Sequence, residues 1–260
     1  MDFFEAIILG IIQGLTEFLP VSSSGHLEIS KYLFGIDADA SFSFSVAVHG
    51  ATVLSTIVVF WNEIIKLIRG TLEFRYNEET RYVLKIFVSL IPVMVVGVFF
   101  KDFVESYFDG NIVFVGVMLL TTAGLLIISG LIKGSNRSIN FLDAFIIGIA
   151  QAFAVLPGIS RSGATISTGL LLGNNRNDLA KFSFLMVLIP VLGANLLEMT
   201  GGDFSKDSSV GAGIIIVGFI TAFITGVLAC RWMIKIVRRG KLFWFGLYCL
   251  IIGLISILVF

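Results

Sequence analysis

Long apolar stretches separated by short polar connections make up most of the 260-residue chain. Six of these stretches are close to the length of about 20 residues that an α-helix needs to cross the hydrocarbon core of a bilayer. They run over approximately 44–61, 83–100, 111–132, 182–199, 210–229 and 242–260. The pattern therefore predicts six transmembrane helices in an all-α polytopic membrane protein.

Two more apolar stretches, at about 3–34 and 141–172, are interrupted in the middle by Pro, Gly and Ser residues. The interruptions read PVSSSGH over 20–26 and PGISRSG over 157–163. Each flanking half is too short to cross a bilayer, so each stretch predicts a re-entrant helix-loop-helix segment. Because irregular backbone is stable at membrane depth only where protein or water satisfies its polar groups, we expect both interruptions to line a cavity.

The two interrupted stretches also resemble each other in sequence. Residues 6–25 align without a gap with residues 144–163, and eight of the 20 aligned positions are identical. Shared membrane composition accounts for matches of Ile and Ala, but not for Gln, Ser and Gly in the same register. Three spans separate the copies, which inverts the second, and inverted repeats with broken helices place their site between the copies. We therefore expect one membrane domain over 1–260, built from inverted repeats at about 1–132 and 141–260.

The distribution of basic residues predicts how the chain is oriented. Lys and Arg are concentrated in the connections 62–85 and 230–241, whereas 101–110 and 200–209 contain one Lys each and more acidic than basic residues. By the positive-inside rule the first two connections lie in the cytoplasm and the other two outside. Both termini then lie outside. The first interrupted stretch enters from the outer side and the second from the cytoplasmic side.

Composition agrees with a membrane protein and excludes other classes. Hydrophobic residues make up 57% of the chain and charged residues 14%, against about 25% charged residues in a soluble domain. The 18 basic and 18 acidic residues balance, so no nucleic-acid partner is expected. Asp2 and Glu5 stand where a signal peptide carries basic residues, so a removable signal peptide is not expected either. Cys230 and Cys249 lack the spacing of a metal site or a disulfide framework.

Ionisable residues inside the apolar stretches are candidates for function, because burying them in a membrane is costly. Gln13 and Glu17 are four residues apart and share one face of a helix. The residues that follow Glu17 within one short segment are Ser22, Ser23, Ser24 and His26. A carboxylate binds a metal ion or accepts a proton, a hydroxyl attacks phosphorus or carbon, and a histidine transfers the proton. The structural alternative is that Ser22 caps the second half-helix and Glu17 pairs with Arg161.

The second interruption predicts an anion site. Arg161 lies between Ser160 and Ser162, close to two glycines, and its planar guanidinium binds phosphate or carboxylate oxygens. Gly158 and Gly163 allow backbone N–H groups to approach an anion at the start of a half-helix. The alternative is an arginine that extends to the cytoplasmic face. His49, near the start of the 44–61 stretch, is either an interfacial residue or a functional one.

Two long motifs resemble one known family. QGLTEFLPVSSSGH over 13–26 looks like the first signature of the undecaprenyl-diphosphate phosphatases, also called bacitracin-resistance proteins. PGISRSGAT over 157–165 looks like the second, and the likeness extends over the whole chain in length and span order. The resemblance implies an enzyme of the bacterial cytoplasmic membrane, with its site open to the outer face. It would remove the terminal phosphate from a C55 polyprenyl diphosphate, which regenerates the monophosphate used for peptidoglycan and other envelope polymers.

The resemblance also implies roles for single residues. The family's essential acid, histidine and arginine correspond to Glu17, His26 and Arg161, and its proposed serine nucleophile corresponds to Ser23. The residues expected to bind phosphate are Ser160, Arg161, Ser162, Gly163 and Thr165. Family members need a divalent cation, Mg²⁺ or Ca²⁺, for which Glu17 and Gln13 are the expected ligands. The family accepts Glu or Gln at position 13, so Glu17 is the main carboxylate here.

Considered without the family resemblance, the residues support a second class of protein, a transporter, equally well. Inverted repeats and broken helices are typical of secondary transporters, and a lipid flippase on the same plan is a related alternative. A lipid-scrambling or structural protein does not need Arg161 and Glu17 in one cavity. The sequence leaves open whether Ser23 or a water molecule attacks, and whether the chain forms a homodimer.

Overall fold

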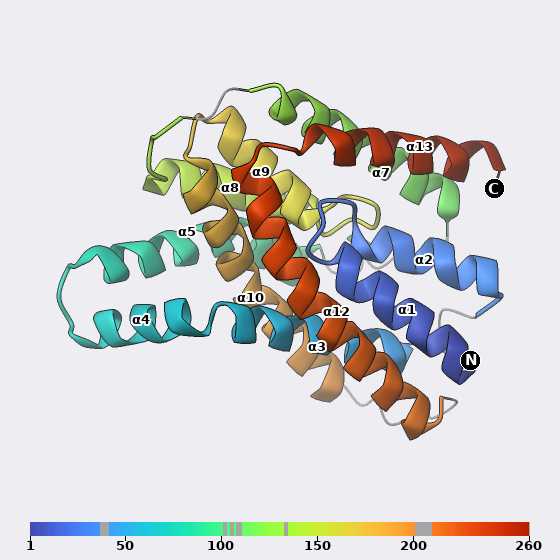
Figure 1. The fold of residues 1–260 in the computed structure, drawn as a ribbon. Coiled ribbons are helices and arrows are strands. Elements are labelled where there is room, and N and C mark those ends of the chain that lie inside the picture. The colour runs from blue at the N-terminus through green and yellow to red at the C-terminus, as the bar shows by residue number, and fades with distance from the viewer. Residues whose placement is uncertain are drawn as a thin grey trace.

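The computed structural model describes residues 1–36, 42–100, 103–104, 107, 111–132, 135–200 and 210–259. Over these residues the secondary structure consists of α-helices and one isolated β-bridge, between Arg137 and Asn174. The helices pack into one helical body, in which α7 and α13 run side by side (Figure 1). The predicted all-α class is confirmed.

The helices follow the predicted order of apolar stretches, apart from one helix within 62–85, which was expected to be a connection. The first half of the chain forms α1 (Phe3–Thr16), α2 (Ser23–Phe34), α3 (Phe42–Val59), α4 (Trp61–Leu72), α5 (Glu78–Phe99) and α7 (Ile112–Gly130). The second half forms α8 (Phe141–Phe153), α9 (Arg161–Leu171), α10 (Arg176–Thr200), α12 (Ala212–Arg238) and α13 (Phe243–Val259). Among the described helices, α3, α5, α7, α10 and α12 are long and apolar enough to cross a membrane. The sixth predicted span, 242–260, corresponds to α13, an apolar helix of 17 residues.

The two faces of α12 show how the fold divides between lipid and protein. Large side chains that are more than half exposed recur at every fourth position on one face, namely Ile216, Ile220, Ile224, Leu228 and Trp232. The buried face contains small residues, among them Gly218, Ala222, Gly226 and Ala229. A continuous apolar stripe of this length is stable against acyl chains rather than water. The chain is therefore an all-helical polytopic membrane protein.

Close helix packing depends on glycine at two equivalent positions of the sequence alignment. A Cβ atom on Gly10 of α1 would lie 2.7 Å from the carbonyl oxygen of Gly218 on α12. A Cβ atom on Gly148 of α8 would lie 2.3 Å from the carbonyl oxygen of Ser89 on α5. Each glycine thus lets two helix backbones touch, as small residues do in membrane helix pairs.

The two interrupted stretches form the helix pairs α1–α2 and α8–α9. Ser22 precedes α2, and its hydroxyl accepts a hydrogen bond from the N–H of Gly25 at 3.3 Å. Ser160 precedes α9 in the same way and accepts from the N–H of Gly163 at 3.0 Å. The expected cap at Ser22 is confirmed, and its φ of 70° is a strained conformation for a residue other than glycine.

Helices distant in sequence bind the irregular backbone of both interruptions. Thr122 of α7 donates its hydroxyl to the carbonyl of Gly158 and accepts from the N–H of Ser160, both at 3.1 Å. The thiol of Cys249 on α13 donates to the carbonyl of Pro20 at 3.8 Å. Protein groups thus satisfy backbone atoms that would be costly to expose to hydrocarbon.

Candidate active site

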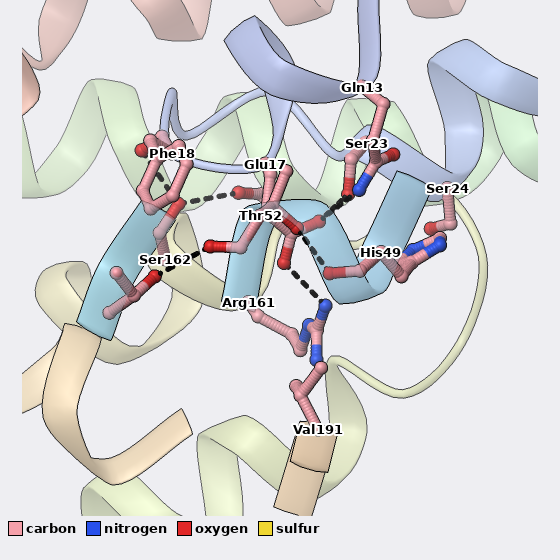
Figure 2. A network of polar contacts seen from close by, with 12 residues as sticks. Gln13, Glu17, Phe18, Ser23, Ser24, His49, Thr52, Arg161, Ser162 and Val191 are labelled. Carbon is pink, nitrogen blue, oxygen red and sulfur yellow. Dashed lines mark hydrogen bonds and ion pairs between the residues drawn. The ribbon is translucent and has the colours of Figure 1, made fainter. Parts of the chain in front are cut away.

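Glu17 lies where the two interruptions meet. It caps the C-terminus of α1, and its side chain is 12% exposed. One carboxylate oxygen, Oε2, accepts hydrogen bonds from Ser23 Oγ at 2.6 Å and from Gln13 Nε2 at 3.0 Å. The other, Oε1, accepts from Arg161 Nη2 at 2.7 Å (Figure 2). Both oxygens are thus used by residues that the sequence analysis selected.

The ion pair between Glu17 and Arg161 joins positions that are 144 residues apart in the chain. The Arg161 side chain is 27% exposed, so a large part of the pair is shielded from solvent. The Arg161 side chain therefore extends to Glu17, at the end of α1. The pairing of Glu17 with Arg161, which the sequence analysis named as the structural alternative, is present. It accompanies the Ser23 contact on the other oxygen and does not replace it.

Ser23 is the first residue of α2 and is nearly buried, with 8% exposure. Its hydroxyl donates to Glu17, so the carboxylate is the proton acceptor that the structure provides for this oxygen. A serine hydroxyl is a weak nucleophile unless an adjacent base accepts its proton. The structure places such a base in direct contact with Ser23.

Ser162 and Thr165, which were also expected to bind phosphate, have different hydrogen-bond partners. The hydroxyl of Ser162 lies 3.4 Å from the carbonyl oxygens of Phe18 and Leu19, next to Glu17. The Thr165 hydroxyl is fully buried, donates to the Arg161 carbonyl at 2.8 Å and lies 2.6 Å from Ser183 Oγ.

The start of α9 leaves two donors for an anion. Ser160 uses its hydroxyl for the N–H of Gly163, as described above. In the part of the chain that the structure describes, the N–H groups of Arg161 and Ser162 have no acceptor. These first two N–H groups of a helix are suited to bind an anion. Phosphate binding by this segment stays a prediction.

His26 does not contact the Ser23 hydroxyl or the Glu17 carboxylate. Its Nδ1 lies 2.8 Å from the carbonyl oxygen of Ser22, and its Nε2 lies 2.8 Å from the hydroxyl of Tyr248 on α13. The rings of His26 and Tyr248 stack, with 5.5 Å between centroids and an interplanar angle of 11°. The sequence predicted His26 as the base or acid next to Ser23, whereas the contacts of the described residues give the place beside Ser23 to Glu17.

His49, by contrast, lies in the neighbourhood of Glu17. It is on α3, and its Nδ1 lies 2.8 Å from the carbonyl oxygen of Ser45. Its ring is close enough to interact electrostatically with Glu17 and Arg161. Figure 2 shows His49 and Thr52 on the helix that passes behind the carboxylate. A functional role for His49 stays a prediction.

A pocket opens beside the Glu17–Arg161 pair, between α3 and α10. Its polar lining consists of the two ionic residues together with Thr52, Thr56, Ser162 and Ser183. Its apolar wall includes Val53 of α3 and Phe184, Val187, Leu188 and Val191 of α10. The cavity has a volume of about 30 Å³, close to that of one water molecule. Its lining combines charged and hydroxyl groups with aliphatic and aromatic side chains.

The donors present fit a hard divalent cation that is held mainly by a substrate. In the described part of the chain no group of three or more His, Cys, Asp or Glu residues is placed to hold a metal ion. The oxygen donors are the Glu17 carboxylate and Gln13 Oε1, which is buried and has no hydrogen-bond partner. Mg²⁺ is commonly bound through one or two carboxylates together with substrate phosphates. The fit is therefore to a cation shared with a phosphorylated ligand.

Sequence reasoning missed two residues near the site. Thr52 lines the pocket from α3, and Tyr248 binds His26 from α13. Both lie in stretches that the sequence pattern predicts to be uniform membrane spans. The signal for Tyr248 was a hydroxyl in the middle of the apolar 242–260 stretch. Thr52 follows His49 by three residues and so lies near the same helix face.

Comparisons with known proteins match nearly the whole chain. The family model described as "Bacitracin resistance protein BacA" matches residues 6–255. A protein of Bacteroides fragilis named undecaprenyl-diphosphatase is 54% identical over 264 residues, which cover 100% of this chain and 98% of that protein. Proteins with the same name are 54% identical in Parabacteroides distasonis, over 99% of this chain and 98% of theirs, and 49% identical in Christiangramia forsetii, over the same shares. The range that the family model matches includes every residue of the site.

Proposed function

The chain belongs to the bacitracin resistance protein BacA family, and we propose that it hydrolyses undecaprenyl diphosphate to undecaprenyl phosphate and inorganic phosphate. Relatives with this activity in their name cover the whole chain at up to 54% identity. The reaction recycles a lipid carrier, and the family name links it to bacitracin resistance. The protein is an enzyme of the phosphoanhydride hydrolase class.

The observation that carries this proposal is the position of Glu17 between Ser23 and Arg161. Hydrolysis of a diphosphate needs an oxygen nucleophile, a base for its proton and positive charge for the phosphate oxygens. Ser23, Glu17 and Arg161 supply these three in one contact network. Because only Nη2 of Arg161 contacts Glu17, other N–H groups of the guanidinium remain for a two-point contact with phosphate.

The reaction follows from these contacts. Ser23 Oγ attacks the terminal phosphorus, and its proton passes to Glu17. A bond forms between Oγ and phosphorus, while the bond from phosphorus to the bridging oxygen breaks, and undecaprenyl phosphate leaves with the electron pair. Water then cleaves the phosphoserine and restores the Ser23 hydroxyl. In the alternative route the water attacks directly, and Ser23 and Glu17 orient it.

The lipid part of the substrate is proposed to lie along the apolar residues of α3 and α10. Val187 and Val191 of α10 line the same pocket as the Glu17–Arg161 pair. The first isoprenyl units would pack against Val187 and Val191 while the diphosphate reaches Arg161. A divalent cation, when bound, neutralises the phosphate oxygens. Glu17 and the unpartnered Gln13 Oε1 are its proposed protein ligands.

We also propose the arrangement in the membrane. Six spans and two re-entrant pairs form inverted repeats, with 62–85 and 230–241 in the cytoplasm and both termini outside. Support comes from matching features in the two halves. Asp2 with Glu5, and Asn140 with Asp143, form capping boxes at equivalent positions of α1 and α8. The proposed location is the cytoplasmic membrane, with the site open to its outer face. A homodimer stays an untested prediction.

The test is phosphate release from a water-soluble short-chain prenyl diphosphate by the detergent-purified protein, with and without EDTA. We expect steady release that EDTA abolishes and added Mg²⁺ or Ca²⁺ restores. The Glu17→Gln variant keeps the shape of the side chain and should release none. Absence of phosphate release by the wild-type protein in the presence of either cation would overturn the proposed function and favour a transporter.

A further inference from the structure

The hydroxyl of Tyr248 has one partner in the described structure, and that partner is His26. The two residues are 222 positions apart, on α13 and α2. Besides the hydrogen bond of 2.8 Å, their rings are nearly parallel. Tyr248 lies in a helix of sequence FWFGLYCLIIGLISILV, where a phenylalanine would fit the apolar surroundings equally well. The hydroxyl therefore has a use that membrane packing does not explain.

The direction of the two hydrogen bonds on His26 follows from their partners. A backbone carbonyl only accepts, so Nδ1 must carry the proton that it donates to Ser22. In the neutral imidazole the Nε2 atom then holds a lone pair, and the Tyr248 hydroxyl is the donor to it. Together, Ser22 and Tyr248 select one tautomer and one ring orientation.

The bond to Ser22 connects this arrangement to the reaction centre. Ser22 is the cap of α2 and directly precedes Ser23, whose hydroxyl contacts Glu17. The next residue of α13, Cys249, contacts the carbonyl of Pro20 in the same interruption. Two successive residues of α13 thus contact the first interruption. Cys249 binds the backbone carbonyl of Pro20, and Tyr248 binds the side chain of His26.

Building on the proposed function, we propose that Tyr248 is a positioning residue for the phosphatase reaction, which fixes the orientation of the His26 ring. His26 then presents the Nε2 lone pair at a constant place, where it can accept a proton in place of the Tyr248 hydrogen bond and then, as an imidazolium, donate to a phosphate oxygen. The hydrogen bond at one ring nitrogen of a histidine decides the protonation state of the other nitrogen. Tyr248 does not contact the reacting atoms in this scheme and acts through His26.

The kinetic test compares Tyr248→Phe, His26→Ala and the double variant, using release of phosphate from a short-chain prenyl diphosphate. We expect Tyr248→Phe to lower kcat by about 10-fold, within the range of a weakened acid–base contribution, with little change in KM. In the double variant Tyr248→Phe should add no further loss to that of His26→Ala, because residues acting as a unit are not additive. Tyr76→Phe, on an exposed residue after α4, is the matched control and should match wild type.

A second readout does not depend on activity. The chain contains two histidines, so a His49→Gln variant assigns both side chains in a ¹⁵N–¹H spectrum of the detergent-solubilised protein. We expect the Nδ1-protonated form for His26 in the wild type, with an Nε2 resonance that shifts in Tyr248→Phe because the hydrogen bond to Nε2 is lost. Thermal unfolding of each variant separates this effect from a loss of fold.

The outcomes distinguish this inference from the proposed function. If wild type releases no phosphate, the proposed function is wrong. If wild type is active but Tyr248→Phe matches it in kcat and in the His26 spectrum, the positioning role is wrong while the proposed function stands. A full multiplicative loss in the double variant would also overturn it, because Tyr248 would then act independently of His26.

Discussion

Ser23 and Arg161 occupy equivalent positions in the two interruptions and bind opposite oxygens of one carboxylate. Each is the first residue of its half-helix, α2 or α9, and they align with each other when 6–25 is placed on 144–163. Ser23 donates to Oε2 of Glu17 and Arg161 to Oε1. Two aligned segments thus place different groups on Glu17, a hydroxyl from one and a guanidinium from the other.

The contact between Ser23 and Glu17 predicts covalent catalysis. Ser23→Ala should lower phosphate release by at least about 1,000-fold, because loss of a nucleophile has effects of that size or larger. Rapid quench of the wild type with a radiolabelled terminal phosphate should trap phosphoserine at position 23. The matched control is Ser30→Ala, whose hydroxyl donates to the carbonyl of His26 within α2. Near-normal turnover of Ser23→Ala would remove this residue from the reaction, and partial loss without a phosphoserine would favour attack by water.

The orphaned oxygen of Gln13 predicts how the cation requirement can be changed. Gln13→Glu adds a carboxylate four residues before Glu17, and cation affinity rises with the number of charged ligands. The Mg²⁺ concentration for half-maximal activity should therefore fall, by roughly 10-fold on the scale of ligand changes at a metal site. Titration of the EDTA-treated enzyme measures it. An unchanged Mg²⁺ requirement in an active Gln13→Glu variant would place the cation elsewhere.

Packing of α1 on α12 predicts a stability effect at Gly14. A Cβ atom there would lie 1.9 Å from Thr225 Oγ1 and 2.7 Å from the carbonyl oxygen of Ala222. Gly14→Ala should destabilise the protein by about 1–3 kcal/mol, the usual cost of overpacking, measured as thermal unfolding in detergent. Gly124→Ala is the control, because nothing lies within 4 Å of its Cβ position. Equal stability of the two variants would contradict the described contact.

The proposed topology predicts which engineered cysteines react from outside. Arg75→Cys and Arg239→Cys lie in the two basic connections and should be protected from a membrane-impermeant thiol reagent in intact cells. Asp203→Cys, in the acidic connection 200–209, should react. Both native cysteines are buried, which keeps the background low. Labelling of Arg239→Cys from outside would reverse the orientation and move the opening of the site to the cytoplasmic face.

The sequence predicted the long membrane helices because each is a continuous apolar stretch. It did not predict α4, an amphipathic helix within the expected connection 62–85. The cap at Ser22 and the pairing of Glu17 with Arg161 were also named from residue types at the two breaks, whereas the cap at Ser160 was not. Local pattern does not determine which histidine approaches Glu17. That depends on tertiary packing, since Tyr248 of α13 binds His26 while α3 carries His49 toward the carboxylate. Contacts between residues more than 200 positions apart leave no periodic signal in one sequence.

The central claim is that the two interruptions form a single phosphate site, in which Arg161 grips the substrate beside Glu17. The most direct test is kcat/KM of Arg161→Lys, which keeps the charge but loses the planar two-point contact. Arg137→Lys is the control, because Arg137 pairs with Asp143 at the start of α8. We predict a loss of at least ~10-fold for Arg161→Lys, about 1.4 kcal/mol of transition-state stabilisation, with unfolding temperature unchanged. A value of kcat/KM equal to that of wild type would show that Arg161 does not clamp the phosphate and would contradict the shared site.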